Sequence, residues 1–271
     1  MSWIAQTSLK VLWSAASAIG LRRLRHMLPS HYRDTTFFWD SRTVHGYVAL
    51  TIDDGLCRSG PEASLVNEIR AVLREHEAHA TFFVCSNYLK GVESAAADLV
   101  ADGHELGNHM AEDRNFHYSK LPEADFEEEL VAVTAAIEAV PGAAVRWFRA
   151  PQGMLTKRMA RVVQRRGLKH ALGDAYCDDW AMAHNARFVT RTLLHQCAHG
   201  SIIILHQPER GFREHTLQVL RDLLHGLTAR GLRCLTLSEM EAIAASSSTA
   251  SAADAAAPRL EREEWEGVVL S

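Results

Sequence analysis

Short apolar runs alternate with helix-like patterns between residues 46 and 244. The strand-like runs occupy residues 47–53, 80–85, 105–107, 145–149, 169–173, 201–206 and 233–237. The run 202–205 is apolar without alternation, as expected of a parallel strand buried on both faces. Strands that alternate with helices predict a parallel sheet of right-handed βαβ units, either a barrel or an open doubly wound sheet. In both architectures, reactive side chains lie at the carboxyl ends of the strands.

The segments on either side of this region differ from it in composition. Residues 1–33 contain no acidic residue, five serines and five basic residues. We expect residues 1–45 to be an extension that serves as a targeting segment, a membrane-surface helix or a helix packed on the domain. A membrane span is not favoured, because Lys10 interrupts the apolar stretch. Residues 245–257 are nearly all Ala, Ser and Thr and precede charged residues, so 245–271 is expected to be a flexible tail. Before it, residues 238–241 (Ser-Glu-Met-Glu) predict a capping box for the last helix.

Two adjacent carboxylates, Asp53 and Asp54, end the first apolar run and precede Gly55. Buried carboxylates are costly unless a positive group binds them. Because neighbouring residues on a strand point in opposite directions, the two are expected to have different tasks, one as a metal ligand and the other as a base. The alternative is a solvated Asp-Asp-Gly turn.

A histidine and a carboxylate, His109 and Asp113, follow the third run. On a helical turn, positions i and i+4 lie on one face of the helix. Together with an aspartate from another strand end, the two would form a three-ligand metal site with open positions for water and substrate. The alternative is an i,i+4 ion pair or a surface histidine.

Two further strand ends carry Arg149, in the segment Arg-Ala-Pro-Gln-Gly, and His206, after four apolar residues. An arginine at this place could orient a neighbouring carboxylate through bidentate hydrogen bonds. A histidine at the mouth of an apolar strand is well placed to protonate a leaving group. The alternatives are an arginine in a surface loop and a histidine that packs in the core or at its rim.

The order of these motifs resembles the NodB homology domain of the polysaccharide deacetylases. The segments that carry the resemblance are Thr-Ile-Asp-Asp-Gly (51–55), Ala-Thr-Phe-Phe-Val (80–84), Gly-His-Glu-Leu-Gly-Asn-His (103–109), Arg-Ala-Pro-Gln-Gly (149–153) and Ile-Ile-Leu-His (203–206). The resemblance spans about residues 46–244. It implies a single α/β domain, a deformed (β/α)7 barrel of parallel strands, that removes N-acetyl groups from an amino-sugar glycan such as chitin or peptidoglycan.

The resemblance also implies roles for individual residues. It makes Asp53 the general base, held by Arg149, and His206 the general acid. It makes Asp54 a ligand of a divalent metal ion. In the family, an aspartate shortly before a tryptophan tunes the acid; here Asp174, Asp178 and Asp179 all precede Trp180, and Asp174 is favoured because it ends its predicted strand.

The second motif departs from the family pattern. The family usually has His-Ser/Thr-x-x-His, with both histidines on the metal, whereas Asp113 stands here in place of the second histidine. A site formed by Asp54, His109 and Asp113 would hold zinc, or a harder ion such as cobalt or manganese. It would polarise water and a carbonyl group less than the usual Asp–His–His site does, since two carboxylates cancel the charge of the ion. This departure keeps open a catalytically silent barrel that binds glycans or acts as a scaffold. A deacetylase or amidase of small, non-polymeric substrates is a third interpretation.

The overall composition adds limits on partners. A net charge of −4 gives no electrostatic reason to expect nucleic acid as a partner. The five cysteines are widely spaced, odd in number and without a CxxC pair, which favours free thiols. Few aromatic residues could line a groove for an N-acetylated carbohydrate; the candidates are Trp147, Tyr176 and Trp180, and packing is the expected task of Trp147.

Overall fold

One parallel sheet organises the chain in the computed structural model, which describes residues 28–114, 116–182 and 185–256. Its strands are β1 (Tyr47–Gly55), β2 (Thr81–Val84), β3 (Glu105–Asn108), β4 (Trp147–Phe148), β5 (Lys169–His170), β6 (Ala175–Tyr176), β7 (Ile202–His206) and β8 (Arg233–Leu235). They follow the order β5-β4-β3-β2-β1-β7-β6, and β8 pairs with β1. β8 and β2 share one edge of β1, with β8 beside Tyr47 to Ala49 and β2 beside Thr51 to Gly55, while β7 occupies the other edge. β1 is therefore the central strand.

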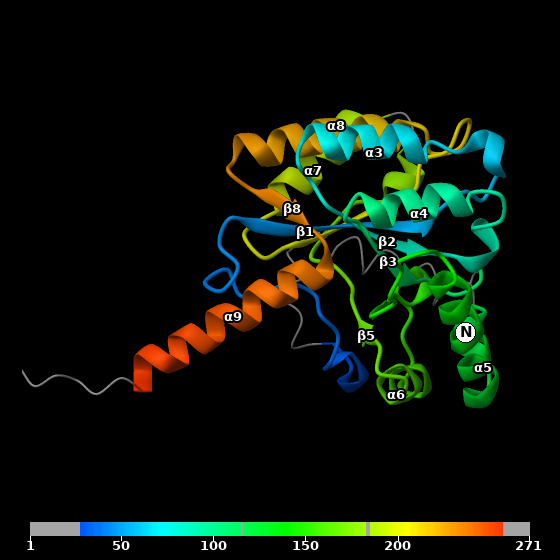
Figure 1. Ribbon diagram of the computed structural model, residues 1–271, viewed down its shortest axis with the longest axis horizontal. Coiled ribbons are helices and arrows are strands. Elements are labelled where there is room, and N and C mark those ends of the chain that lie inside the picture. Colours follow the sequence, from blue (N-terminus) through cyan, green and yellow to red (C-terminus); the bar gives the residue numbers. More distant parts are fainter. Residues whose placement is uncertain (1–27, 115, 183–184, 257–271) are drawn as a thin grey trace, which may run out of the picture.

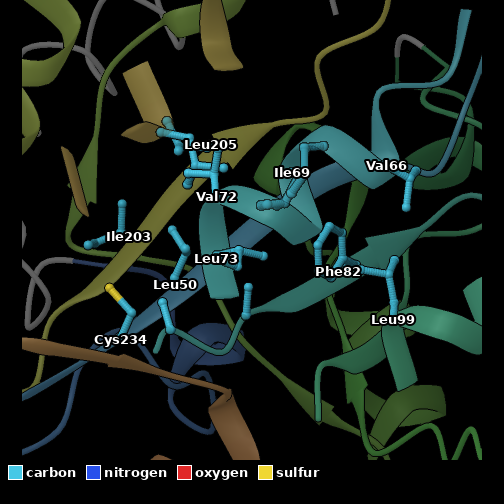
Figure 2. Packing of buried hydrophobic residues seen from close by; sticks show 14 of the residues in the cluster. Leu50, Val66, Ile69, Val72, Leu73, Phe82, Leu99, Ile203, Leu205 and Cys234 are labelled. Atoms are coloured by element: carbon cyan, nitrogen blue, oxygen red, sulfur yellow. The ribbon is translucent and has the colours of Figure 1, made fainter. Parts of the chain in front are cut away.

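Helices cover the sheet and bury its apolar strands (Figure 1). They are α3 (Val66–Glu75), α4 (Glu93–Ala101), α5 (Glu123–Glu138), α6 (Lys157–Arg165), α7 (Ala186–Gln196), α8 (His215–Ala229) and α9 (Leu237–Ala256). In the main core, apolar residues of α3 such as Ile69 and Leu73 lie near Leu50 of β1 and Phe82 of β2 (Figure 2). Because both faces of β1 are covered, eight of its nine residues are buried, and polar groups at its end are removed from bulk water.

The sheet is open between its end strands, β5 and β6. Residues before β1 lie in this region: Thr36 forms a parallel bridge with Ala171, and Phe38 an antiparallel bridge with Ser201. Val44, in the turn before β1, is buried in a second apolar cluster. The prediction of a deformed (β/α)7 barrel in a single α/β domain is confirmed.

The fifth predicted strand differs from the expectation. Of residues 169–173, only Lys169–His170 form β5, and the chain then crosses to pair Ala175–Tyr176 with β7. Gly173 allows this crossing, because a Cβ atom there would lie 2.6 Å from the carbonyl oxygen of Ile202. The close approach of two backbones needs a residue without a side chain.

The last helix begins and ends elsewhere than the sequence predicts. Its capping box is formed by Thr236 and Glu239: the Thr236 Oγ1 accepts from the Glu239 N–H at 3.1 Å, and the Glu239 Oε2 accepts from the Thr236 N–H at 2.8 Å. The box is therefore centred two residues earlier than expected. The helix also continues to Ala256, into a segment expected to be flexible and visible in Figure 1 as a projection from the body. The reason is that alanine has the highest helix propensity.

Two other expectations concern membrane spans and the state of the cysteines. In the described part of the chain, no helix has both the length and the apolar character that a membrane crossing requires. The five cysteines are all free and buried, which confirms the prediction of free thiols.

Candidate active site

A β-bulge at the end of β1 places the two adjacent carboxylates. Ile52 pairs with Phe82 and Gly55 with Val84, so β1 has one more residue than β2 over this interval. Asp54 lies in the bulge and has a left-handed backbone, with φ of 59°. A bulge and a left-handed residue both break the regular alternation of side chains along a strand. Asp53 and Asp54 consequently both face the loops at this edge of the sheet, and both are nearly fully buried.

The first carboxylate is held by a buried arginine. Arg149 Nη1 donates to Asp53 Oδ1 at 2.6 Å and to Thr51 Oγ1 at 2.7 Å. The expected bidentate contact is not formed, because Nε and Nη2 donate instead to the carbonyl oxygens of Ala171 and Leu172. Burial lowers the pKa of the Arg149 guanidinium, and the Asp53 carboxylate opposes that effect. The arginine thus fixes Asp53 while it joins the ends of β1 and β4 to the segment after β5.

The second carboxylate faces His109, which follows β3. The Nδ1 atom of His109 lies 2.8 Å from the carbonyl oxygen of Arg149. Because a carbonyl only accepts, Nδ1 carries a proton and Nε2 is the nitrogen directed at Asp54, 3.7 Å from its Oδ1. This Oδ1 atom is buried and has no hydrogen-bond partner in the structure. Burial would raise the pKa of Asp54, but the charges of His206, Arg213 and His109 lower it below its usual value.

The backbone before Asp113 differs from the helical turn that the sequence predicts. Residues 109–114 form no helical turn, since Met110 has a left-handed backbone with φ of 64° and its N–H donates to the side chain of Asn108. The i,i+4 argument for His109 and Asp113 is therefore wrong. The Asp113 Oδ1 atom accepts a hydrogen bond from Gln152 Nε2 at 3.2 Å. Burial and the charge of Asp54 raise the pKa of Asp113.

Arg114 and Arg149 pair with carboxylates other than Asp113. Arg114 pairs with Glu112, and Arg149 pairs with Asp53. Among the described residues, no three His, Cys, Asp or Glu side chains lie close enough together to hold a metal ion. Two of the expected ligands nevertheless fit one: two donors about 2.1 Å from a tetrahedral ion lie about 3.4 Å apart, close to the 3.7 Å between His109 Nε2 and Asp54 Oδ1. A cation would also satisfy that unpaired buried oxygen.

The histidine at the end of β7 pairs with Asp179 instead of the favoured Asp174. His206 Nδ1 lies 2.6 Å from Asp179 Oδ1, and the His206 N–H donates to Asp179 Oδ2 at 2.8 Å. Asp174 instead accepts from the N–H of Ile202 at 2.8 Å and from Ser201 Oγ at 3.2 Å, at the opposite end of the same strand. The preference for Asp174 is therefore wrong, because a position at a strand end does not fix which carboxylate the intervening loop brings to the ring.

The pairing with Asp179 changes the acidity of His206. Burial lowers the pKa of the imidazole, but the charge and hydrogen bond of Asp179 outweigh burial and raise the pKa to about 9. An ionised carboxylate only accepts, so Nδ1 donates to Asp179 and Nε2 remains available to a substrate. Asp53 and His206 are neighbours in the register of β1 and β7, which places both at the same edge of the sheet.

One side chain that contacts the site, Arg213, was not expected from the sequence. It lies in the loop between β7 and α8, and its Nη1 donates to Asp54 Oδ2 at 2.6 Å. Its side chain is 11% exposed and its guanidinium lies over the ring of Phe212, 4.7 Å from the centroid. The signal that could have found it is its position: in a parallel sheet, the loop after a strand lines the same edge as the strand's last residue.

Comparisons with known proteins agree with this fold. The family model described as Polysaccharide deacetylase matches residues 40–171. A chitooligosaccharide deacetylase of Azorhizobium caulinodans is 30% identical over 195 residues, which cover 68% of this chain and 89% of that protein. A family 4 carbohydrate esterase from Streptomyces lividans, in complex with acetate, superposes with a TM-score of 0.61 at 24% identity, covering 70% of this chain and 92% of that one.

A further solved relative is catalytically silent. It is a CE4 family pseudoenzyme from Bacillus anthracis, with a TM-score of 0.63 at 22% identity over 72% of this chain and 65% of that one. Likeness to these solved structures shows the fold alone. The Azorhizobium protein, by its identity and coverage, also shows the family. The chain belongs to the polysaccharide deacetylase (NodB-like) family of hydrolases that act on carbon–nitrogen bonds.

Proposed function

We propose that the protein removes N-acetyl groups from an amino-sugar glycan of the chitin or peptidoglycan kind. The observation that supports this most is the pairing of Asp53 with Arg149 and of His206 with Asp179 at register neighbours of β1 and β7. A carboxylate fixed by an arginine and an imidazole held protonated at the same edge suit the hydrolysis of an amide, because water must lose a proton and the amine must gain one.

In this proposal, Asp53 is the general base. Its contact with the Arg149 guanidinium, at 2.6 Å, fixes the direction of its oxygens. Asp53 takes a proton from the water that attacks the acetyl carbon. Since Arg149 is itself held by two backbone carbonyls, the base cannot turn away from the edge of the sheet without breaking several hydrogen bonds.

His206 is the general acid. Asp179 holds its Nδ1 proton, so the proton on Nε2 is the one that passes to the departing amine. A sugar amine is too basic to leave as an anion, and the raised pKa of His206, about 9, keeps the imidazole protonated at neutral pH. Asp179 therefore acts as a positioning residue that also sets the charge state of the acid.

Deacetylases of this family generally depend on a divalent metal ion. Asp54 and His109 would hold it here through Oδ1 and Nε2, with Asp113 as the third ligand. The ion would supply polarisation of the acetyl carbonyl and acidification of water. The carbonyl of Arg149 orients His109 for this task through Nδ1, and the ligand set of two carboxylates and one imidazole suits manganese or cobalt as well as zinc.

Exposed aromatic surface beside His206 supports a sugar as the substrate. Trp180 is 42% exposed, and its Nε1 donates to the hydroxyl of Tyr176 at 3.2 Å. The Tyr176 ring lies 6.4 Å from the ring of His206, between centroids. Trp147, in contrast, is fully buried and packs in the core, which is the task expected for it.

Release of acetate from chitin oligomers of increasing length tests the proposal. The purified chain is assayed after loading with Zn²⁺, Co²⁺ or Mn²⁺ and again after treatment with a chelator, with Asp53→Asn as the inactive control. Acetate release that depends on metal and on Asp53 supports a deacetylase. A rate that rises with oligomer length supports a polymer, and a rate independent of length favours a small substrate.

A catalytically silent glycan-binding barrel is the second candidate. Two observations favour it: no described group of three ligands is close enough to hold an ion, and Arg213 already occupies one oxygen of Asp54. This candidate predicts oligomer binding, measured by calorimetry, without acetate release under any metal.

A further inference from the structure

The guanidinium of Arg213 meets Asp54 inside the site. The contact joins Arg213 Nη1 to Asp54 Oδ2 at 2.6 Å, between side chains that are 11% and 7% exposed. It leaves Asp54 Oδ1, the oxygen directed at His109, without a partner. One carboxylate thus has a cation on one oxygen and an open position on the other.

Hydrogen bonds of Glu209 fix the loop that carries Arg213. The Glu209 carboxylate, itself buried, accepts from the N–H groups of Arg58 and Ser59, in the loop after β1, at 2.6 and 2.7 Å. Glu209 also forms a backbone bridge with Phe212, the ring on which Arg213 stacks. The loop that carries Arg213 is therefore tied to the strand that carries Asp54.

The formal charges show what this contact does. Asp54, which is buried, and Asp113, which is half-buried, together contribute a formal charge of −2. Arg213 brings the sum to −1. A divalent ion would bring it to +1 with Arg213 present and to zero without it. An ion whose charge is fully cancelled polarises a bound oxygen less than one that keeps part of its charge.

We propose that Arg213 is the charge counterpart of Asp113: it occupies Oδ2 of Asp54, leaves Oδ1 for the ion and keeps the metal centre electrophilic despite its second carboxylate. This inference rests on the proposed metal-dependent deacetylation. Arg213 is a positioning residue, since it acts through Asp54 and the ion.

The test measures Zn²⁺ binding by calorimetry on the full chain stripped of metal, with thermal unfolding to verify that each variant is folded. Arg213→Met removes the charge at similar length, and Arg213→Lys retains it. Arg210→Met is the matched control, because Arg210 lies on the same loop but pairs with Glu68 and has a 56% exposed side chain. Arg213→Met/Asp113→His removes one charge of each sign and supplies a neutral ligand.

We expect Arg213→Met to bind Zn²⁺ about tenfold more tightly or more, because a repelling charge is gone, and yet to release acetate more slowly. Arg213→Lys and Arg210→Met should bind like the wild type. Asp113→His should restore the acetate-release rate of the Arg213→Met chain, which a merely structural role of Arg213 does not predict.

Three results would overturn the inference. Unchanged Zn²⁺ affinity in Arg213→Met shows that the guanidinium does not act on the ion. Faster acetate release in Arg213→Met alone, or Zn²⁺ binding only after that change, shows that Arg213 blocks the site instead of tuning it. If neither the wild type nor any variant binds Zn²⁺, Co²⁺ or Mn²⁺, the proposed metal-dependent function fails as well, which distinguishes the two failures.

Discussion

Replacement of Asp179 by asparagine should shift the alkaline limit of the reaction toward lower pH. In the wild type, the pKa of His206 is raised from 6.5 to about 9, with Asp179 as the cause that outweighs burial. This difference corresponds to about 3 kcal/mol in favour of the protonated imidazole. Asparagine keeps the shape and can still accept from the His206 N–H, but it carries no charge. Burial and the nearby Arg213 then act without opposition from Asp179, and we expect the pKa to fall by more than two pH units.

The pH profile of kcat/KM for acetate release measures this effect. Its alkaline limb, where the acid loses its proton, should shift toward lower pH in Asp179→Asn, while the rate at pH 6 falls far less than at pH 8. Asp178→Asn is the control, because the Asp178 carboxylate accepts from the Tyr176 hydroxyl at 2.7 Å. An alkaline limb that stays in place in Asp179→Asn would refute the assignment of His206 as the acid tuned by Asp179.

Stability gives an independent readout of the same pair. A histidine whose folded pKa lies above its unfolded value stabilises the fold fully below the unfolded pKa, and this contribution is lost as pH rises through the folded pKa. The free energy of unfolding of the wild type should therefore exceed that of Asp179→Asn most below about pH 6.5, and the excess should decline by pH 9. Urea titrations at both pH values measure the difference; an excess that grows with pH would contradict the sign.

Three further changes probe the rest of the site. Asp53→Asn should lower kcat by about 10²–10⁴-fold with unchanged metal content, since it removes the base but no ligand; kcat within a few-fold of the wild type would exclude Asp53 as the base. Asp113→Ala should lose bound metal, measured by elemental analysis, together with activity; equal metal content would remove Asp113 from the ligand set. Arg149→Met should destabilise the fold by about 3–5 kcal/mol in urea unfolding, because Asp53 is left as an unpaired buried charge and the carbonyls of Ala171 and Leu172 lose their donor; a loss under about 1 kcal/mol would show that the pair is hydrated.

The sequence by itself determined the framework on which the site is built. Apolar runs separated by helical patterns predicted parallel strands, and Asp53, Arg149 and His206 lie at or next to strand ends that meet at one edge of the sheet. This succeeds because burial on both faces requires continuous apolar residues, which are visible without the structure. A polar residue directly after such a run must lie at the strand end, and parallel strands bring their carboxyl ends together.

Several contacts within the site were decided by the tertiary structure alone. Three carboxylates precede Trp180, and only the path of the loop brings Asp179 to His206. The bulge at Asp54 and the left-handed turn at Met110 depend on how β1, β2 and β3 pair, not on local spacing. Arg213 meets Asp54 across 159 residues of chain. Hydrophobic pattern reports which residues leave water, whereas the pairing of charges depends on distances between distant segments, and these exist only once the chain has folded.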